Sequence, residues 1–295
     1  MPRRERAAVA GNPLMFSPDR GGESTDGSLR GTVPSQPDLR EASRLADGRS
    51  TYVVSGIELL ILDIDDTLAL PQSEHLGALR RLQQQALERA LGAETGLNPA
   101  EARAVADLYR REHGGGEFAF LDPLVHERLP VGTRRAGAPA LLRAARLWDE
   151  LAAIEPAPFF IRAPDTVDHL TALRSHVRIA AITDSPEPLS RRILSAIGLN
   201  PDTDFDLYLP WQRDDAGPPK RTRGSAPFAE IAARLGIPHD RILAIGDTPR
   251  FDLDPAARIG MKTLHLGPGS QPLVTSVLQI AFRPGDLTVA EAAAP

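Results

Sequence analysis

Residues 57–68 read IELLILDIDDTL, an apolar run that ends in three aspartates and a threonine. The run is short and almost free of charge, which is typical of a strand buried on both faces of a parallel sheet. Ligand sites of such sheets lie beyond the carboxyl ends of the strands. The stretch therefore predicts a buried parallel strand that brings Asp63, Asp65 and Asp66 to a functional edge.

After residue 164 the sequence alternates between helical and strand patterns. The expected helices are 165–175, 186–197, 226–235 and 253–259, and the expected strands are 177–183, 205–209, 241–247 and 262–266. Gly198, Gly236 and Gly260 end three of these helices. This alternation predicts an α/β fold built on a doubly wound parallel sheet.

A mostly helical insertion separates the first strand from the rest of this pattern. We expect helices at 74–91, 98–113 and 138–154, the second capped by Asn98 with Glu101 reaching back. The predicted domains are a core of residues 51–70 and 164–280 and a helical cap of residues 71–163. Residues 1–50 are poor in apolar side chains and predict a disordered tail, and residues 281–295 a C-terminal tail.

The composition limits the classes of function. The net charge is −5 and charged residues of both signs make up 25% of the chain, which argues against a nucleic-acid partner. There is no cysteine, which excludes disulfides, thiolate metal sites and a cysteine nucleophile. No apolar run approaches the ~18 residues needed to span a bilayer. The N-terminus also lacks the apolar core of a secretory signal. We therefore expect a cytoplasmic protein without a membrane partner, of unknown oligomeric state.

The cluster Asp63, Asp65 and Asp66 predicts a metal site. Gathering carboxylates where water is scarce is costly unless a cation neutralises them, and hard oxygen ligands favour Mg²⁺. The alternative is a solvated acidic turn after a strand. An EF-hand loop is disfavoured, because the glycine at its sixth position is missing and a buried strand precedes it.

A second apolar strand ends in Gly246 and Asp247, with Asp252 five residues further on. Because the carboxyl ends of parallel strands meet at one edge of a sheet, Asp247 is expected to approach Asp63 and to share its cation. The alternative is a helix start, with Asp252 or Asp254 as a cap and Asp247 in a loop.

Thr183 and Lys220 are candidate phosphate ligands. Thr183 ends a strand directly before a helix, where a hydroxyl and main-chain amides can hold phosphate oxygens. Lys220 lies in an expected loop before residue 226 and is one of only two lysines in the chain. A strand-end threonine and a solvated loop lysine are the alternatives.

Four segments between residue 57 and about residue 267 resemble the motifs of the haloacid-dehalogenase-like superfamily. They occur along the chain in the order of those motifs. LDIDDTL (62–68) resembles the first motif, AIT (181–183) the second, Lys220 the third, and IGDTPRFD (245–252) the GDxxxxD form of the fourth. The third is the loosest match, because PPKRTRGSAPF (218–228) lacks the usual Lys-Pro pair and Arg221 or Arg223 could replace the lysine. Asp184 stands where many relatives carry asparagine.

The resemblance implies a phosphatase that works through an aspartyl-phosphate. Asp63 would attack phosphorus, and Asp65 would protonate the leaving alcohol and then activate water. Dehalogenases have no leaving oxygen to protonate and typically lack this second aspartate. Asp252 would orient Lys220 or a metal-bound water.

The resemblance also implies the ligands of the cofactor and of the phosphate. Mg²⁺ would be held by a carboxylate oxygen of Asp63, the main-chain carbonyl of Asp65 and the side chain of Asp247. Thr183 and Lys220 would hold the equatorial phosphate oxygens.

The insertion resembles a helical cap, and NPAEARAVADLYRREHG (98–114) is similar to the cap of pyrimidine-5'-nucleotidase-like members. Caps favour small, diffusible substrates. The candidates are a sugar or cyclitol phosphate, a nucleoside monophosphate, or a phosphorylated intermediate of secondary metabolism. The alternatives are a phosphomutase with the same motifs and a noncatalytic binding or regulatory protein on this fold.

Overall fold

The computed structural model describes residues 40–44, 50–104, 107, 144–161, 164–266 and 286–290. Most of the predicted N-terminal tail lies outside these residues. The same holds for the end of the helix expected at 98–113, the start of the one expected at 138–154, and most of the C-terminal tail.

Five parallel strands form the central sheet, in the order β5-β4-β3-β6-β7. Their bounds are β3 (Leu59–Asp63), β4 (Arg178–Pro186), β5 (Leu207–Trp211), β6 (Ile242–Gly246) and β7 (Lys262–His265). β3 is central and lies between β4 and β6, with Asp63 opposite Ile182 and Leu62 opposite Ile245. The sequence prediction of a parallel α/β sheet is confirmed, and three strands that carry candidate residues are neighbours.

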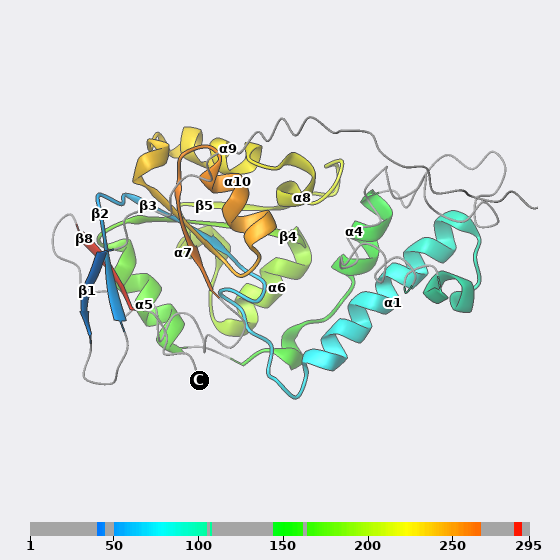
Figure 1. Ribbon diagram of the computed structural model, residues 1–295. Helices are drawn as coiled ribbons and strands as arrows, with labels where there is room; N and C mark the ends of the chain where they lie inside the picture. The colour runs from blue at the N-terminus through cyan, green and yellow to red at the C-terminus, as the bar shows by residue number, and fades with distance from the viewer. Residues whose placement is uncertain are drawn as a thin grey trace, which may run out of the picture. The chain divides into compact units, whose positions relative to one another are not determined.

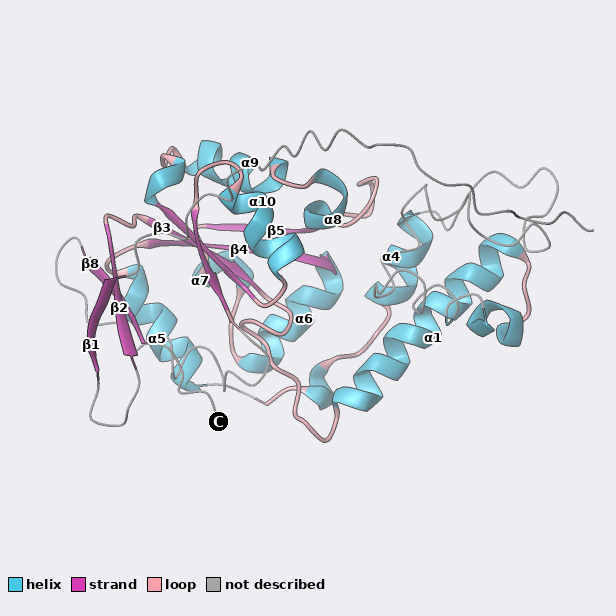
Figure 2. Cartoon of the chain, in the orientation of Figure 1, coloured by secondary structure: helices cyan, strands magenta, loops and turns pink. Residues whose placement is uncertain are grey.

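Alternation of side chains along the strands produces two apolar layers, one on each face of the sheet. Leu60 and Leu62 face one layer, which includes residues of α5 (Pro164–Arg174) and α6 (Glu187–Ile197). Leu59 and Ile61 face the other, which includes residues of α9 (Ala226–Leu235) and α10 (Asp254–Ala257). Figures 1 and 2 show these helix pairs on opposite sides of the strands. Helices on both faces explain why β6 is apolar throughout and β3 is apolar up to Asp63.

The insertion between β3 and α5 contains α1 (Leu76–Thr95), a helical turn at 99–104, α4 (Ala144–Ala152) and the 3₁₀ turn η3 (Ala157–Phe159). The predicted cap at Asn98 is present: its Oδ1 accepts from the amides of Ala100 and Glu101 at 3.0 Å. The Glu101 carboxylate in turn accepts from the amide of Asn98 at 2.9 Å. Trp148 of α4 donates from its indole to the carbonyl of Trp211 in β5, at 2.9 Å, which attaches the insertion to the sheet.

Three further strands form a separate antiparallel sheet, in the order β1-β2-β8. They are β1 (Arg40–Arg44), β2 (Ser50–Ser55) and β8 (Asp286–Ala290). β1 and β8 fall in the two expected tails, because neither has the apolar pattern of a core strand.

Short helical segments complete the described elements. They are α7 (Pro201–Asp204), α8 (Pro219–Arg223), η4 (His239–Arg241) and the π-helical turn η5 (Pro249–Leu253). α8 and η5 matter for the site, because they carry Lys220 and Asp252. The sequence predicted a loop at Lys220, where the structure has a helical turn.

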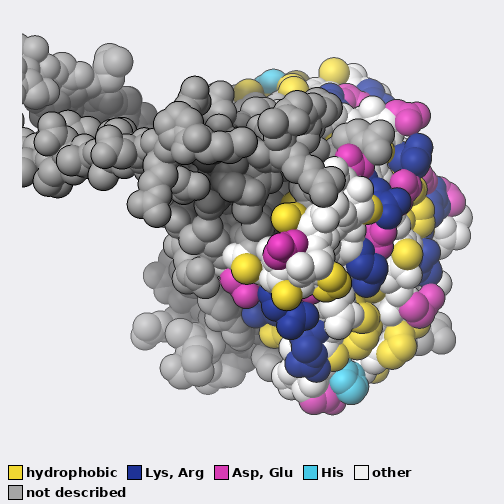
Figure 3. All heavy atoms as spheres, turned by 90° about the vertical axis from the view of Figure 1, so that its right-hand side faces the viewer, with side chains coloured by type: hydrophobic (Ala, Val, Ile, Leu, Met, Phe, Trp, Pro, Cys, Tyr) yellow, Lys and Arg dark blue, Asp and Glu magenta, His cyan; other side chains and the backbone are white. Residues whose placement is uncertain are grey.

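Charged side chains of both signs are interspersed on the described part of the face in Figure 3. This distribution agrees with the mixed charges of the sequence. Among the described helices, none has the length and apolar character needed to cross a bilayer.

Candidate active site

A tight turn after β3 shapes the first part of the site. Asp63 ends the strand and is 3% exposed. The amides of Thr67, Leu68 and Ala69 then converge on the carbonyl of Ile64, at 2.8–3.3 Å. Asp66 adopts a φ of 56°, a left-handed conformation that aspartate tolerates better than most residues. The turn places the side chains of Asp63 and Asp65 at the same edge of the sheet.

The end of β6 and the following turn η5 supply a second pair of carboxylates, Asp247 and Asp252. One carboxylate oxygen from each of Asp63, Asp247 and Asp252 lies within 4.8 Å of the other two. A Cβ on Gly246 would lie 2.4 Å from the Cβ of Asp252, so only glycine leaves room for that aspartate. The neighbouring strands thus bring Asp247 to Asp63, as the sequence analysis expected.

Lys220 lies between two of these carboxylates. Its Nζ is 2.6 Å from Oδ1 of Asp63 and 2.6 Å from Oδ1 of Asp252, and all three side chains are buried. Arg223 instead pairs with Glu230, at 2.6 Å on the exposed side of α8. Of the three cations considered for the third motif, Lys220 contacts Asp63 and Asp252, Arg221 contacts Asp184, and Arg223 contacts Glu230. Lys220 as the phosphate ligand stays a prediction.

Burial and charge act on these groups in opposite directions. Burial raises the pKa of Asp63 well above its usual range, and the ammonium of Lys220 opposes this rise. Burial alone would lower the pKa of Lys220, but Asp63, Asp252 and Asp184 outweigh it and raise that pKa. Lys220 is therefore protonated at neutral pH, and its charge offsets part of the effect of burial on the pKa of Asp63.

Asp65 is held by two hydroxyls from the end of β4. Its Oδ2 accepts from Oγ1 of Thr183 at 2.6 Å and from Oγ of Ser185 at 2.9 Å. The amide of Ser185 donates to Thr183 Oγ1 at 2.9 Å, which orders this small network. The phosphate contact expected of Thr183 stays a prediction, because its side chain is fully buried and bonded to Asp65.

The carboxylates fit a divalent cation bound by oxygen. Asp252 accepts from Lys220 through Oδ1 and from the amide of Thr248 through Oδ2, at 2.9 Å, so both of its oxygens are bonded. Asp63 and Asp247 are then the carboxylates best placed to ligate an ion. Burial, and next the charge of Asp252, raise the pKa of Asp247, which shows the cost of ionising it without such an ion. This donor set suits Mg²⁺.

A cavity of about 190 Å³ opens onto these groups. Its described lining comprises Asp63, Asp65, Asp66, Gln83, Asp184, Ser185, Lys220, Arg221, Asp247, Thr248, Phe251 and Asp252. Gln83 belongs to α1, so the insertion contributes a side chain to the same cavity as the strand ends.

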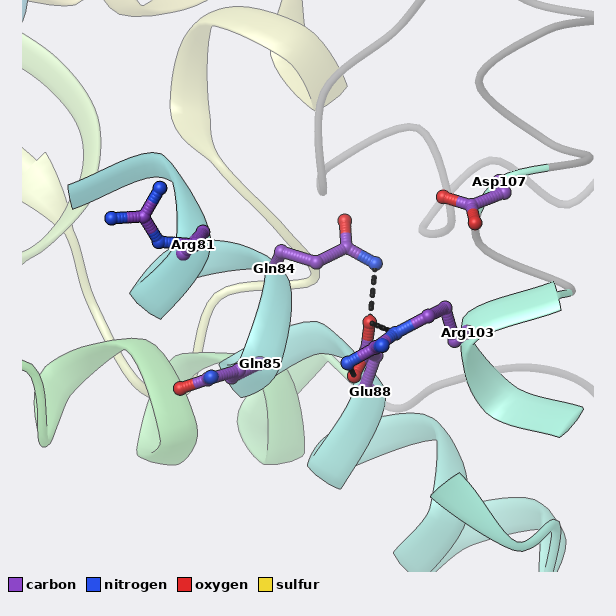
Figure 4. Close-up of a pocket in the computed structure, with 6 residues that line it drawn as sticks. All are labelled: Arg81, Gln84, Gln85, Glu88, Arg103 and Asp107. Carbon is purple, nitrogen blue, oxygen red and sulfur yellow. Dashed lines mark hydrogen bonds and ion pairs between the residues drawn. The ribbon is translucent and has the colours of Figure 1, made fainter. Parts of the chain in front are cut away.

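A second hollow, of about 250 Å³, lies within the insertion. Figure 4 shows Glu88 between Gln84 and Arg103 in its wall. The buried carboxylate of Glu88 accepts from Gln84 Nε2 at 2.7 Å and from Arg103 Nε at 3.0 Å. The bond from Arg103 joins α1 to the turn at 99–104, and we assign the hollow to the packing of the insertion.

Several lining residues were missed by the sequence analysis. Ser185 lies between an expected strand and an expected helix, Gln83 lies within an expected helix, and neither carries a motif signal. Asp184 was noted as a departure from the family pattern and Arg221 as a possible replacement for the lysine of the third motif, but the two were not expected to be partners. In the structure they form an ion pair, with Arg221 Nε 3.2 Å from Asp184 Oδ2. The unusual residues at these two positions were the signal in the sequence that could have indicated this contact.

Residues 57–260 match the family model described as haloacid dehalogenase-like hydrolase, which covers more than half of the chain. This range includes each candidate residue of both strand ends. No curated protein matches the chain.

Three similar solved structures are the following. A HAD phosphatase from Thermococcus onnurineus has 21% identity and a TM-score of 0.43, over 73% of this chain and 88% of that one. A HAD family enzyme from Bacteroides thetaiotaomicron, in complex with magnesium and inorganic phosphate, has 13% identity and a TM-score of 0.41, over 73% and 97%. A 2-haloacid dehalogenase from Pseudomonas syringae pv. Tomato DC3000 has 18% identity and a TM-score of 0.40, over 71% and 86%. Likenesses of this size do not bear on the reaction.

Proposed function

Because the chain belongs to the haloacid dehalogenase-like hydrolases, we propose that it is a Mg²⁺-dependent phosphatase of small phosphate monoesters. The observation that carries this proposal is the meeting of Asp63, Asp247 and Asp252 around one point, with Lys220 Nζ 2.6 Å from the carboxylate of Asp63. A second aspartate, Asp65, lies in the same cavity. These are the parts that transfer of a phosphoryl group through a carboxylate requires.

In the first step the ionised carboxylate of Asp63 attacks phosphorus. The bond between phosphorus and the leaving oxygen breaks, and Asp65 gives its proton to that oxygen. The alcohol leaves, and an aspartyl-phosphate remains on Asp63. The hydrogen bonds from Thr183 and Ser185 hold the Asp65 carboxyl group in one orientation for this transfer.

In the second step water releases the phosphate. Asp65, now a carboxylate, takes a proton from the water, whose oxygen attacks phosphorus and displaces Asp63. Inorganic phosphate leaves, Asp63 is a carboxylate again, and Asp65 is again protonated. One residue thus serves as acid and then as base, as a two-step displacement requires.

Charge neutralisation accompanies both steps. Asp63, Asp247 and the main-chain carbonyl of Asp65 would hold Mg²⁺, which when bound screens the repulsion between the anionic nucleophile and the phosphate. Lys220 adds a positive charge beside Asp63. Lys220 and Thr183 are the proposed ligands of the equatorial phosphate oxygens, and Asp252 positions Lys220 through its 2.6 Å contact.

The proposed substrates are small metabolites. The described cavity of about 190 Å³ suits a phosphate group with a small leaving group, and Gln83 of the insertion borders it. The candidates are sugar and cyclitol phosphates, nucleoside monophosphates and phosphorylated intermediates of secondary metabolism.

A phosphate-release assay over a panel of these esters, with and without Mg²⁺, tests the proposal. The wild-type protein is expected to release phosphate from at least one ester only when Mg²⁺ is present. Asp63→Asn should lose this activity by more than about a thousandfold, because its amide is a poor nucleophile. Asp254→Asn is the matched control, since Asp254 is an exposed residue outside the cavity lining.

Two results would contradict the proposal. One is retention of most Mg²⁺-dependent activity by Asp63→Asn. The other is transfer of phosphate between positions of a sugar, dependent on a bisphosphorylated activator and without net release, which would identify a phosphomutase instead.

A further inference from the structure

Asp184 and Arg221 form an ion pair at the border of the proposed active site. Resting on the proposed function, we infer that Arg221 binds a second anionic group of the substrate. The leaving group would therefore carry a carboxylate or a second phosphate near the scissile ester. This narrows the candidates from neutral sugar or cyclitol phosphates to phosphorylated acids and bisphosphates.

The guanidinium of Arg221 is fixed on two sides. Its Nε lies 3.2 Å from Asp184 Oδ2, and its Cζ lies 4.0 Å from the centre of the Phe251 ring. The side chain is 25% exposed and lines the same cavity as Asp63 and Lys220. A guanidinium stacked on an aromatic ring is held in one orientation, and its planar group of N–H donors matches a carboxylate or a phosphate at two points.

Lys220 and Arg221 serve different parts of the cavity, although they are adjacent in the chain. Successive residues of a helix point about 100° apart. Lys220 reaches Asp63 and Asp252, and Arg221 reaches Asp184 and Phe251. A phosphate at Asp63 therefore meets Lys220, and a group further along the leaving group meets Arg221.

Asp184 does more than attach α8 to the sheet, because its carboxylate also holds Arg221 in position. Its Oδ1 accepts from the main-chain amide of Lys220 at 2.8 Å, a contact that the side-chain carbonyl of an asparagine could also make. The second, charged oxygen faces Arg221. Placing a buried carboxylate here instead of an amide is costly. What it adds is a fixed position for the arginine.

The charge of the cavity determines where a second anion can be accommodated. Its described lining holds six aspartates, one lysine and one arginine, a formal charge of −4. An anionic group is repelled from most of such a surface. Lys220 and Arg221 are the two cations of the described lining. Because Lys220 is the proposed ligand of the transferred phosphate, a second anionic group would bind at Arg221.

Matched substrates test this inference. The probes are 2-phosphoglycerate and glycerol 2-phosphate, which differ by a carboxylate in place of a hydroxymethyl group, and fructose 1,6-bisphosphate beside fructose 6-phosphate. The wild-type enzyme with Mg²⁺ is expected to prefer the more anionic member of at least one pair by about tenfold or more in kcat/KM. Arg221→Ala should remove this preference chiefly by raising KM for that member.

Further variants separate recognition from a structural role. Arg221→Lys should restore part of the preference, and Asp184→Asn should weaken it. Arg223→Ala, on the exposed side of α8, should leave it unchanged. The inference is overturned if the wild-type enzyme has no preference in either pair, or if Arg221→Ala lowers kcat/KM equally for both members. Absence of phosphate release from every ester of the wider panel would instead overturn the proposed function, and this inference with it.

Discussion

At the scale of single residues, Gly246 determines whether Asp252 can reach Lys220. A methyl group at this position would lie 2.4 Å from the Cβ of Asp252. Gly246→Ala should therefore displace Asp252, destabilise the protein by about 1–3 kcal/mol and lower activity, because overpacking forces neighbouring atoms apart. Denaturant unfolding together with the phosphate-release assay measures both effects.

Gly77→Ala is the matched control for this prediction. A Cβ there would meet the Arg81 side chain at 3.5 Å, an ordinary contact within α1. Alanine in a helix is favoured over glycine by about 0.5–1 kcal/mol, so this variant should be slightly more stable than the wild type. Equal effects of the two substitutions would refute the steric account of Gly246.

Lys220 is the residue on which the charge balance of the site depends. Lys220→Ala should lower kcat by about a hundredfold or more, because it removes a fixed positive charge from the nucleophile and the phosphate. Arg223→Ala, one turn away on the same short helix, should retain activity. Steady-state kinetics on a responsive ester compares the two, and circular dichroism checks that both variants are folded. A fully active, folded Lys220→Ala variant would exclude the role proposed for Lys220.

The sequence predicted the location of Asp63, Asp65, Lys220 and Asp247, because each follows or precedes a recognisable strand or helix. It did not predict which atoms bond. The contact of Thr183 and Ser185 with Asp65, and of Arg221 with Asp184, joins segments distant in the chain. Such contacts depend on strand register and side-chain rotamers, which local patterns do not specify.

At the scale of elements, the buried Glu88 joins α1 to the turn at 99–104. Arg103→Ala removes a partner from a carboxylate that is 7% exposed, and such a loss is destabilising. We expect Arg103→Ala to lower the melting temperature more than Arg89→Ala does, because Glu150, the partner of Arg89, is 17% exposed. Thermal unfolding followed by circular dichroism tests this order, and an equal or reversed order would contradict it.

Helices and strands were predicted well where local signals are strong. Asn98 with Glu101, and the glycines after α6 and α9, determine helix ends by chemistry confined to a few residues. α8 and η5 were not predicted, since Pro219–Arg223 and Pro249–Leu253 are too short to show a periodic pattern. β1 and β8 were also missed, because neither has the apolar pattern of a core strand, and β8 pairs with a strand that is distant in the chain.

At the scale of the whole molecule, Mg²⁺ should stabilise the fold in a manner that depends on pH. Burial raises the pKa values of Asp63 and Asp247, so without metal the folded state favours their neutral forms. Their contribution to stability is therefore fully present below the ordinary carboxyl pKa and is lost as pH rises from there through the raised pKa values of the folded state. Mg²⁺ binds only the ionised forms, so its stabilising effect should grow as pH rises.

Melting temperatures at pH 5 and pH 7.5, with and without Mg²⁺, measure this linkage. At a concentration of 100 times the dissociation constant, the metal should add about 2.7 kcal/mol at the higher pH. Asp247→Asn should abolish most of the shift. A shift of equal size at both pH values, or one that survives in Asp247→Asn, would contradict the proposed ion site.

The account as a whole depends on a covalent bond between Asp63 and phosphorus, and trapping that bond is its most direct test. The protein is incubated with Mg²⁺ and acetyl phosphate, a small general phosphoryl donor, then quenched with borohydride, which reduces an aspartyl-phosphate to homoserine. Peptide mass spectrometry should find homoserine at position 63, and only when both donor and metal are present. Homoserine at another aspartate, or phosphate release that continues with position 63 unmodified, would contradict the account.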